Sequence, residues 1–221
     1  MELMEVQDAA RQLGVSDRQL RKLVASGQLV ALGRGLVDAR SVWQHQAQQG
    51  VHRERTWAMA TAWAALDMLT GGSAEWLGKT QGSRLKARLD GLSASDLVSR
   101  TRNRATVHRF AAHRSVLKLV GARLVDAGAT GNRLGLIARS DRVDGYLSLD
   151  DLATLIKEYA LTPDLDGSVV VRATSFDLAV VRRIAEQFPL LVAVDLAGSL
   201  DTRERSAGMD AAAVVLKAWH G

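Results

Sequence analysis

The sequence predicts a mixed α/β fold in two parts, a small N-terminal unit and a larger C-terminal domain. Two short amphipathic helices and a glycine-tipped hairpin pattern occupy the first fifty residues. Over the second half of the chain, helical and strand-like patterns alternate, which indicates a sheet covered by helices. We place the domains at residues 1–52 and 53–221, the second helical over 56–100 and mixed α/β over 101–221.

Composition narrows the class of protein. The 221 residues are 47% apolar and 24% charged, as in an average globular protein. There is no cysteine, which excludes disulfides and thiolate chemistry and agrees with a cytoplasmic location. No apolar stretch reaches the length of about 18 residues that spans a membrane, and the acidic N-terminus is unlike a signal peptide.

The positive charge is concentrated in the middle of the chain. Residues 56–125 hold 11 Lys/Arg against 4 Asp/Glu, whereas residues 126–221 hold 10 against 14. A basic stretch beside an acidic one indicates an anionic partner on one side only.

The N-terminal elements follow from apolar spacing. The first helix has an apolar face with the spacing i, i+3, i+4, i+7 and ends at Gly14. Ser16 with Gln19 forms a capping box for the second helix, expected over Ser16–Ser26 and ended by Gly27. The apolar positions of the two helices are Val6, Ala9, Ala10, Leu13, then Leu20, Leu23 and Val24.

Two helices joined by so short a turn have the geometry of a helix-turn-helix, whose second helix enters the DNA major groove. The outward stripe of that helix holds Arg18, Arg21 and Lys22, which can contact guanine or phosphate. Gln19 lies near the helix start, where base edges are reached, but it is also the capping-box partner of Ser16. We select Ser16, Arg18, Gln19, Arg21 and Lys22 as candidate DNA contacts.

A hairpin is expected next. The short apolar runs Gln28–Leu32 and Leu36–Val37 flank Gly33-Arg34-Gly35, a pattern typical of a β-hairpin tip. The hairpin would form a wing with Arg34 as a sixth candidate DNA contact. Asp38 then caps a third helix that contains Val42 and Trp43.

The segment from Met4 to about Gln48 resembles the DNA-binding domains of the excisionase and MerR type. The matching residues are Val6-x-x-Ala9-Ala10-x-x-Leu13-Gly14-Val15-Ser16, Gly27-x-Leu29, the Gly33-Arg34-Gly35 tip and a helix beginning near Ala39. It departs at Glu5, where such domains usually have a Ser or Thr cap. The resemblance implies a winged helix-turn-helix; the alternative is the same fold used only as a protein-interaction module.

Helical and strand-like patterns alternate over the rest of the chain. Capping residues are expected at Thr56, at Ser93 with Asp96 and at Ser148 with Asp151. The helices are expected over Thr56–Leu69, Ser83–Leu89, from Ser93, Ser115–Val125, from Ser148, Phe176–Phe188 and Arg203–Trp219. The strands are expected over Thr106–Phe110, Leu134–Ala138, Val169–Arg172 and Leu190–Leu196.

Arginines recur in the middle of the chain, and Arg102, Arg104 and Arg109 are candidates for additional phosphate contacts. The alternative for this series is a solvated face.

The sequence contains no recognised catalytic motif, so no enzyme, cofactor or metal is expected. His108 and His113 are expected at the surface. Asp164 with Asp166 suits a turn better than a metal pair, and Asp195 suits a cap or a buried ion pair.

The second half resembles the AbiEi-type antitoxins of type IV toxin–antitoxin systems, in versions with an N-terminal winged helix-turn-helix. The residues that carry this likeness are Trp76-Leu77, Ser83-Arg84-Leu85, Arg104-Ala105-x-Val107-x-Arg109-Phe110-x-x-His113, Gly128-Ala129, Asp144-Gly145-Tyr146-Leu147, Tyr159-Ala160-Leu161, Gly167-Ser168-Val169-Val170-Val171-Arg172-Ala173, Val194-Asp195-Leu196, Asp201-x-Arg203 and Ala207-Gly208. Each motif is weak, and their order carries the likeness.

The resemblance implies a repressor of its own operon that counteracts a nucleotidyltransferase-like toxin, by contact or indirectly. Since a single DNA-binding unit of this size binds weakly, we expect two copies on inverted repeats of a double-stranded operator. Two alternatives stay open. One is a ligand-responsive transcription regulator without a toxin partner, and the other is an enzyme with a DNA-binding appendage.

Overall fold

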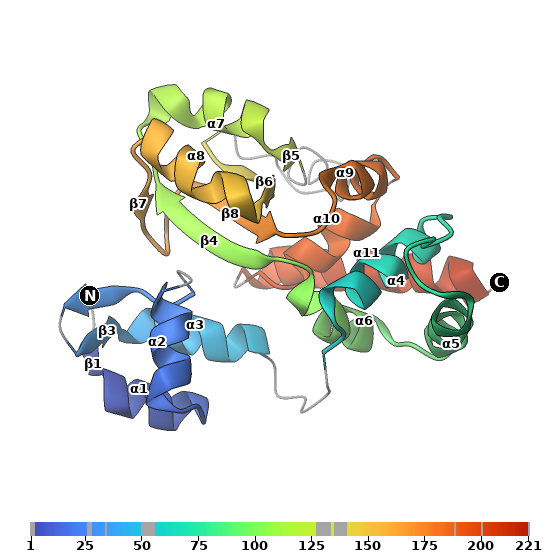
Figure 1. Cartoon of the computed structure of the whole chain (residues 1–221), viewed down its shortest axis with the longest axis horizontal. Coiled ribbons are helices and arrows are strands. Elements are labelled where there is room, and N and C mark those ends of the chain that lie inside the picture. Colours follow the sequence, from blue (N-terminus) through green and yellow to red (C-terminus); the bar gives the residue numbers. More distant parts are fainter. Residues whose placement is uncertain are drawn as a thin grey trace.

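The computed structural model describes residues 3–25, 28–33, 35–49, 56–126, 134, 141–187, 189–199 and 201–220. It has a mixed α/β fold with one small and one larger sheet, as the sequence predicts (Figure 1). The expected end of the second helix at 26–27, the expected linker at 52–55 and all but the first residue of the expected strand at 134–138 lie outside the described residues.

The N-terminal unit combines three helices with a three-stranded antiparallel sheet. Its elements are β1 (Leu3–Glu5), α1 (Val6–Leu13), α2 (Asp17–Ala25), β2 (Ala31–Gly33), β3 (Leu36–Asp38) and α3 (Ala39–Gln49). The strand order is β1-β3-β2, so the expected hairpin gains a third strand that the sequence pattern does not predict. Ala9, Leu20, Leu29, Val37 and Val42 fill the core between helices and sheet.

The C-terminal sheet has five strands in the order β5-β6-β8-β4-β7. These are β4 (Thr106–Ala111), β5 (Val125–Asp126), β6 (Val143–Ser148), β7 (Thr162–Pro163) and β8 (Val169–Thr174). Strand β8 runs parallel to β6 and antiparallel to β4. Every residue of β8 is buried, as expected for a central strand covered on both faces.

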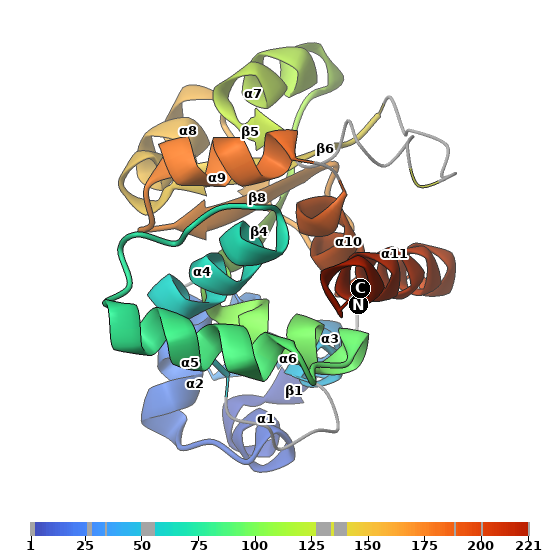
Figure 2. The same ribbon diagram turned by 90° about the vertical axis from the view of Figure 1, so that its right-hand side faces the viewer.

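Helices cover both faces of this sheet (Figures 1 and 2). On one face, α7 (Leu117–Arg123) and α8 (Leu152–Glu158) pack on Phe110, Leu147 and Val171. The helices of the other core are α4 (Met59–Leu69), α5 (Lys79–Leu89), α6 (Ala94–Thr101), α9 (Leu178–Glu186), α10 (Leu190–Leu196) and α11 (Thr202–His220).

Short 3-10 turns precede several of these elements. They are η1 (Arg102–Arg104), η2 (Arg114–Val116) and η4 (Leu149–Asp151). The expected capping box of Ser93 and Asp96 is confirmed at the start of α6. The one expected at Ser148 is wrong in detail, since its hydroxyl accepts from the amide of Asp150 and opens η4 instead of α8.

Two further expectations are corrected. Leu190–Leu196 is helix α10 and not a strand, because an all-apolar run fits a buried helix as well as a buried strand, and this one packs on α11. Thr56 does not cap the next helix, which begins at Met59; its hydroxyl accepts a hydrogen bond from Asn103 (2.7 Å).

The helices among the described residues include none that is both long and apolar enough to cross a membrane.

Candidate nucleic-acid interface

Two features position helix α2 in the N-terminal unit: a hydrogen bond at its first turn and a buried apolar face. The amide of Gln19 donates to the hydroxyl of Ser16 (3.3 Å), which is one of the two hydrogen bonds of the expected capping box. Leu20 is fully buried and Leu23 nearly so, and both pack in the core of the unit. Since this face is held inside, the opposite face of α2 must point to solvent.

The outer face of α2 carries the four charged or polar side chains selected from the sequence. Arg18, Gln19, Arg21 and Lys22 are all exposed. No hydrogen bond or ion pair joins these four side chains to another residue in the described part of the chain. The three cations therefore remain available to an anionic ligand.

The neighbouring helix α1 differs in this respect. Its one basic residue, Arg11, forms an ion pair with Asp8 on the same helix. Helix α2 has only Asp17 to offset its three cations, so the positive charge of the two-helix motif lies on α2.

The hairpin expected as a wing is present as β2 and β3. Gly35, which begins the turn into β3, has φ +80°, a left-handed conformation that favours glycine. Arg34, the candidate contact at its tip, lies outside the described residues.

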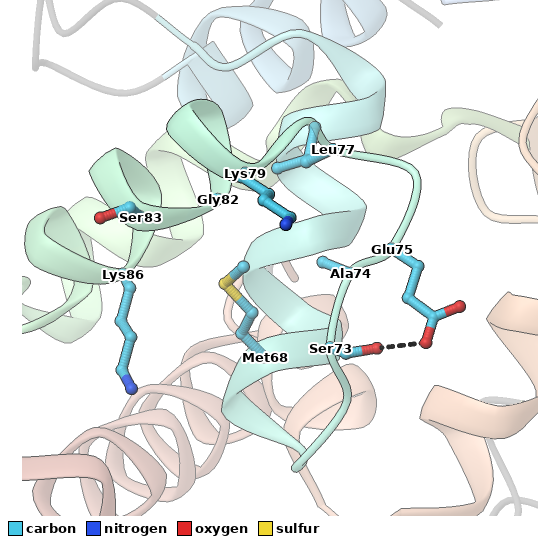
Figure 3. A pocket seen from close by; sticks show the side chains of 9 residues that line it. All are labelled: Met68, Ser73, Ala74, Glu75, Leu77, Lys79, Gly82, Ser83 and Lys86. Atoms are coloured by element: carbon cyan, nitrogen blue, oxygen red, sulfur yellow. Dashed lines mark hydrogen bonds between the residues drawn. The ribbon is translucent and has the colours of Figure 1, made fainter.

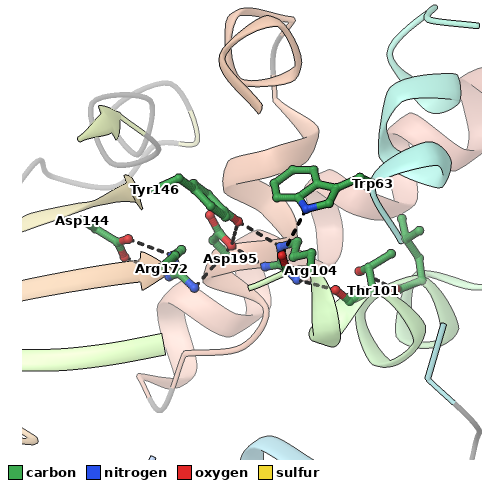
Figure 4. Close-up of polar contacts among 8 residues, drawn as sticks. Trp63, Thr101, Arg104, Asp144, Tyr146, Arg172 and Asp195 are labelled. Carbon is green, nitrogen blue, oxygen red and sulfur yellow. Dashed lines mark hydrogen bonds and ion pairs between the residues drawn. The ribbon is translucent and has the colours of Figure 1, made fainter. Parts of the chain in front are cut away.

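The candidate phosphate contacts Arg102, Arg104 and Arg109 do not form one surface. Arg102 is half-buried in η1. Arg104 is only 6% exposed, and its guanidinium donates to Asp195, Tyr146 and the carbonyl of Thr101 (Figure 4). A guanidinium that is buried and held by three hydrogen bonds cannot reach a phosphate, so the expectation for Arg104 is wrong.

Arg109 is half-buried on β4. Burial, followed by the charge of nearby Arg172, lowers its pKa. The strand register places Arg109 opposite Val170, on the same sheet face as Arg172. The expected contact between Arg109 and phosphate stays a prediction.

Arg104 belongs to a buried charge network between the sheet and α10 (Figure 4). Arg172 donates to both carboxylate oxygens of Asp144 (2.8 and 2.9 Å) and lies 3.3 Å from Asp195. Tyr146 donates to Asp195 (2.7 Å). Two buried arginines therefore face one buried aspartate, Asp195, and one half-buried aspartate, Asp144.

Burial disfavours the charged form of Arg172, but the charges of Asp144 and Asp195 outweigh burial and raise its pKa. Burial also raises the pKa of Tyr146, which stays protonated and donates its hydroxyl proton. The hydrogen bonds and ion pairs of this network join β6 and β8 to α10.

The network settles the interpretation of Asp195. Its position in the sequence left a cap or a buried ion pair open, and the structure shows the buried pair. The partners Tyr146 and Arg172 were not among the predicted site residues, although an arginine between valines and alanine in an apolar strand is a signal of a buried counter-charge.

The remaining candidate residues, two aspartates and two histidines, have structural and not catalytic surroundings. Asp164 accepts from the amide of Asp166 (3.0 Å) in the turn before β8, as expected, and Asp166 pairs with Arg40 of α3 (3.0 Å). His113 is exposed, but the expectation of a surface position for His108 is wrong, because it is 7% exposed beside Phe110. Within the described ranges, no group of three His, Asp or Glu side chains could hold a metal ion.

Comparisons with protein-family models, with curated proteins and with solved structures find no match to this chain. The assignment of α2 as a candidate DNA-binding helix therefore rests on its exposed cationic face alone.

Proposed function

We propose that this protein is a transcriptional repressor that binds double-stranded operator DNA through α2. The observation that carries the proposal is the two-sided character of this helix. Leu20 and Leu23 hold its inner face in the core, and Arg18, Arg21 and Lys22 lie on its outer face with no side-chain partner among the described residues. A rigid helix with unpaired cations is what the major groove accepts.

The side chains on the outer face of α2 suit different groups of the DNA. Arg18 and Arg21 can form bidentate hydrogen bonds with guanine, Gln19 suits adenine, and Lys22 suits guanine or a phosphate. Because a single unit of this size binds DNA weakly, the proposal includes two copies on an inverted repeat. The repressor would act in the cytoplasm, on the DNA of its own operon.

The proposal extends to an antitoxin role against a nucleotidyltransferase-like toxin, and its support is the order of motifs in the second half. Several of these motif residues make contacts that stabilise the fold. Arg104, Tyr146, Arg172 and Asp195 meet in the buried network, and Gly145 lies so close to Leu124 that a Cβ would sit 2.7 Å from it. These motif residues therefore help to hold the C-terminal domain together.

The test of DNA binding uses the purified chain and its own upstream duplex, with a scrambled duplex of equal composition, at two salt concentrations. We expect a preference for the upstream duplex at physiological salt. Arg18→Ala with Arg21→Ala should abolish it, since each lost bidentate contact costs about 1–3 kcal/mol. Far-ultraviolet circular dichroism checks that the double variant is folded.

A matched control removes two exposed arginines from another helix, Arg84→Ala with Arg88→Ala on α5. This variant should keep the wild-type preference. Equal binding of wild-type protein to both duplexes, or wild-type affinity in the α2 variant, overturns the assignment.

The antitoxin role has a separate test. The chain is co-expressed with the product of the adjacent gene in its operon, and growth is followed. We expect rescue of growth by the wild-type chain and also by the α2 double variant, because neutralisation would belong to the C-terminal domain. Absence of rescue by the wild-type chain removes the antitoxin role and leaves the DNA-binding proposal in place.

A further inference from the structure

A pocket of about 450 Å³ opens between the end of α4, the segment that follows it and helix α5 (Figure 3). Met68, Ala74 and Leu77 supply its apolar lining, and Lys79, Gly82 and Lys86 of α5 form one wall. The volume is within the range of about 300–1,000 Å³ that ligand pockets have.

Gly82 lines this pocket and has no side chain to fill it. It lies in the interior of α5, where glycine is unfavourable for a helix. A Cβ at this position would meet only the terminal methyl of Met68, at an ordinary contact distance of 3.7 Å. Packing therefore does not require glycine here, and a larger side chain would occupy the pocket.

The apolar wall is held in a fixed shape. Ala74 has φ +48°, a left-handed conformation that is costly for a residue with a Cβ. The buried carboxylate of Asp67 accepts from the amide of Ala74 (2.9 Å) and from Arg183 (2.8 Å), which holds the segment in place. A preformed concave wall lowers the cost of binding.

Helix α5 places two cations, Lys79 and Lys86, at the pocket, and Glu75 of the segment after α4 also lines it. Lys79, Arg84, Lys86 and Arg88 are all exposed, and the helix contains no acidic residue. Lys86 lies over the ring of Trp219, 5.8 Å from its centroid. The side chains of Lys79, Arg84 and Arg88 form no hydrogen bond or ion pair with any residue that the structure describes.

We propose that this face of α5 and its pocket form a docking site for an acidic segment of a partner protein, which inserts one apolar side chain between Met68, Ala74 and Leu77. A central apolar anchor inside a polar rim is the pattern of a protein interface, whereas a DNA backbone has no group that uses an apolar pocket. Figure 1 places α5 at the far end of the molecule from α2, so a duplex on α2 leaves this face free. The inference does not depend on the DNA-binding proposal.

The experiment selects random phage-displayed peptides on the immobilised full-length chain. The enriched peptides are synthesised with a fluorescent label, and their binding is measured by anisotropy at physiological salt. We expect peptides with several carboxylates around one large apolar residue. Gly82→Leu, which fills the pocket without changing charge, and Lys79→Glu should each weaken binding about tenfold or more.

The control is Arg18→Glu with Arg21→Glu on α2, which removes more positive charge than Lys79→Glu and should leave peptide binding unchanged. The proposal is overturned if no such peptides are enriched, or if Gly82→Leu binds them as tightly as wild type. It is also overturned if unlabelled duplex DNA displaces them from both wild type and the α2 variant, because α5 would then be a DNA contact. Circular dichroism confirms folding, and Lys79→Gln replaces Lys79→Glu if the latter fails to fold.

Discussion

Asp195 shows how a single residue ties distant elements together. It lies on α10 and accepts hydrogen bonds from Arg104, after α6, and from Tyr146 of β6. Arg172 of β8 adds a cationic neighbour at 3.3 Å. Removing one partner of a buried ion pair is costly because the others are left charged without compensation.

We therefore expect Asp195→Asn to lower the free energy of unfolding by about 3–5 kcal/mol, measured by urea denaturation. Asp166→Asn is the matched control, since the pair of Asp166 with Arg40 has exposed side chains (66% and 49%) and is worth less than about 1 kcal/mol. Equal, small losses in both variants would show that the buried network does not stabilise the fold.

His108 makes the stability of the folded chain depend on pH. Burial lowers its pKa below the usual value, and its Nε2 atom has no hydrogen-bond partner among the described residues. At acidic pH the unfolded chain therefore binds more protons than the folded chain, so the free energy of unfolding falls as pH drops from about 7 to about 5.

His108→Phe should make that fall shallower, because phenylalanine keeps the stacked contact with Phe110 and carries no proton. The measurement is urea denaturation of both chains at several pH values across the same range. Parallel curves for the two proteins would remove His108 from the acid response.

Among the helices, close contacts decide which glycines are needed. Gly208 lies in α11 against α10, where a Cβ would be 2.5 Å from the carbonyl oxygen of Ala193. Gly82, also inside a helix, has room for a Cβ. The same substitution must therefore have opposite effects in the two helices.

Gly82→Ala should raise the free energy of unfolding by about 0.5–1 kcal/mol, since alanine restricts the unfolded chain and favours the helix. Gly208→Ala should lower it, because α10 and α11 would have to separate. Thermal and urea denaturation of the two variants test this. A stabilising Gly208→Ala would mean that α11 packs less closely than the structure shows.

Across the molecule as a whole, the N-terminal unit has a hydrophobic core of its own. Leu20, Leu29 and Val37 pack within it, and none of them belongs to the cores around the large sheet. The ion pair of Arg40 with Asp166 joins the two parts, but it is exposed and therefore weak. The two parts also meet where buried His45 of α3 lies near the charge of Arg102. Separate cores favour separate unfolding transitions.

Leu20→Ala should therefore destabilise one calorimetric transition and leave the other in place, with a loss of about 2–5 kcal/mol in the N-terminal unit. DNA binding should weaken in parallel, because Leu20 anchors α2. A single transition that shifts as a whole would show that the two parts unfold cooperatively.

Much of the N-terminal unit and of the candidate site follows from local signals. The i, i+3, i+4 spacing fixes which side of α2 is buried, so the exposure of Arg18, Arg21 and Lys22 follows from the amino-acid sequence alone. The capping serines at positions 16 and 93 act on residues only three positions away; the box at Ser93 is found in full, whereas Ser16 shows only the hydrogen bond from the amide of Gln19. Strand β1 could not be predicted because three residues carry no usable periodicity.

Local patterns were enough to predict the mixed α/β class, the two-helix motif and the cationic outer face of α2, because these depend on interactions within one or two turns of chain. Long-range packing was needed to show that the run Leu190–Leu196 is a helix, that Arg104 is buried instead of free for phosphate, and that Asp195 pairs with Arg104 and Tyr146, which are distant in the sequence. An apolar run or a lone charge is compatible with several local structures, and the choice among them depends on which distant groups can satisfy it once the chain is packed.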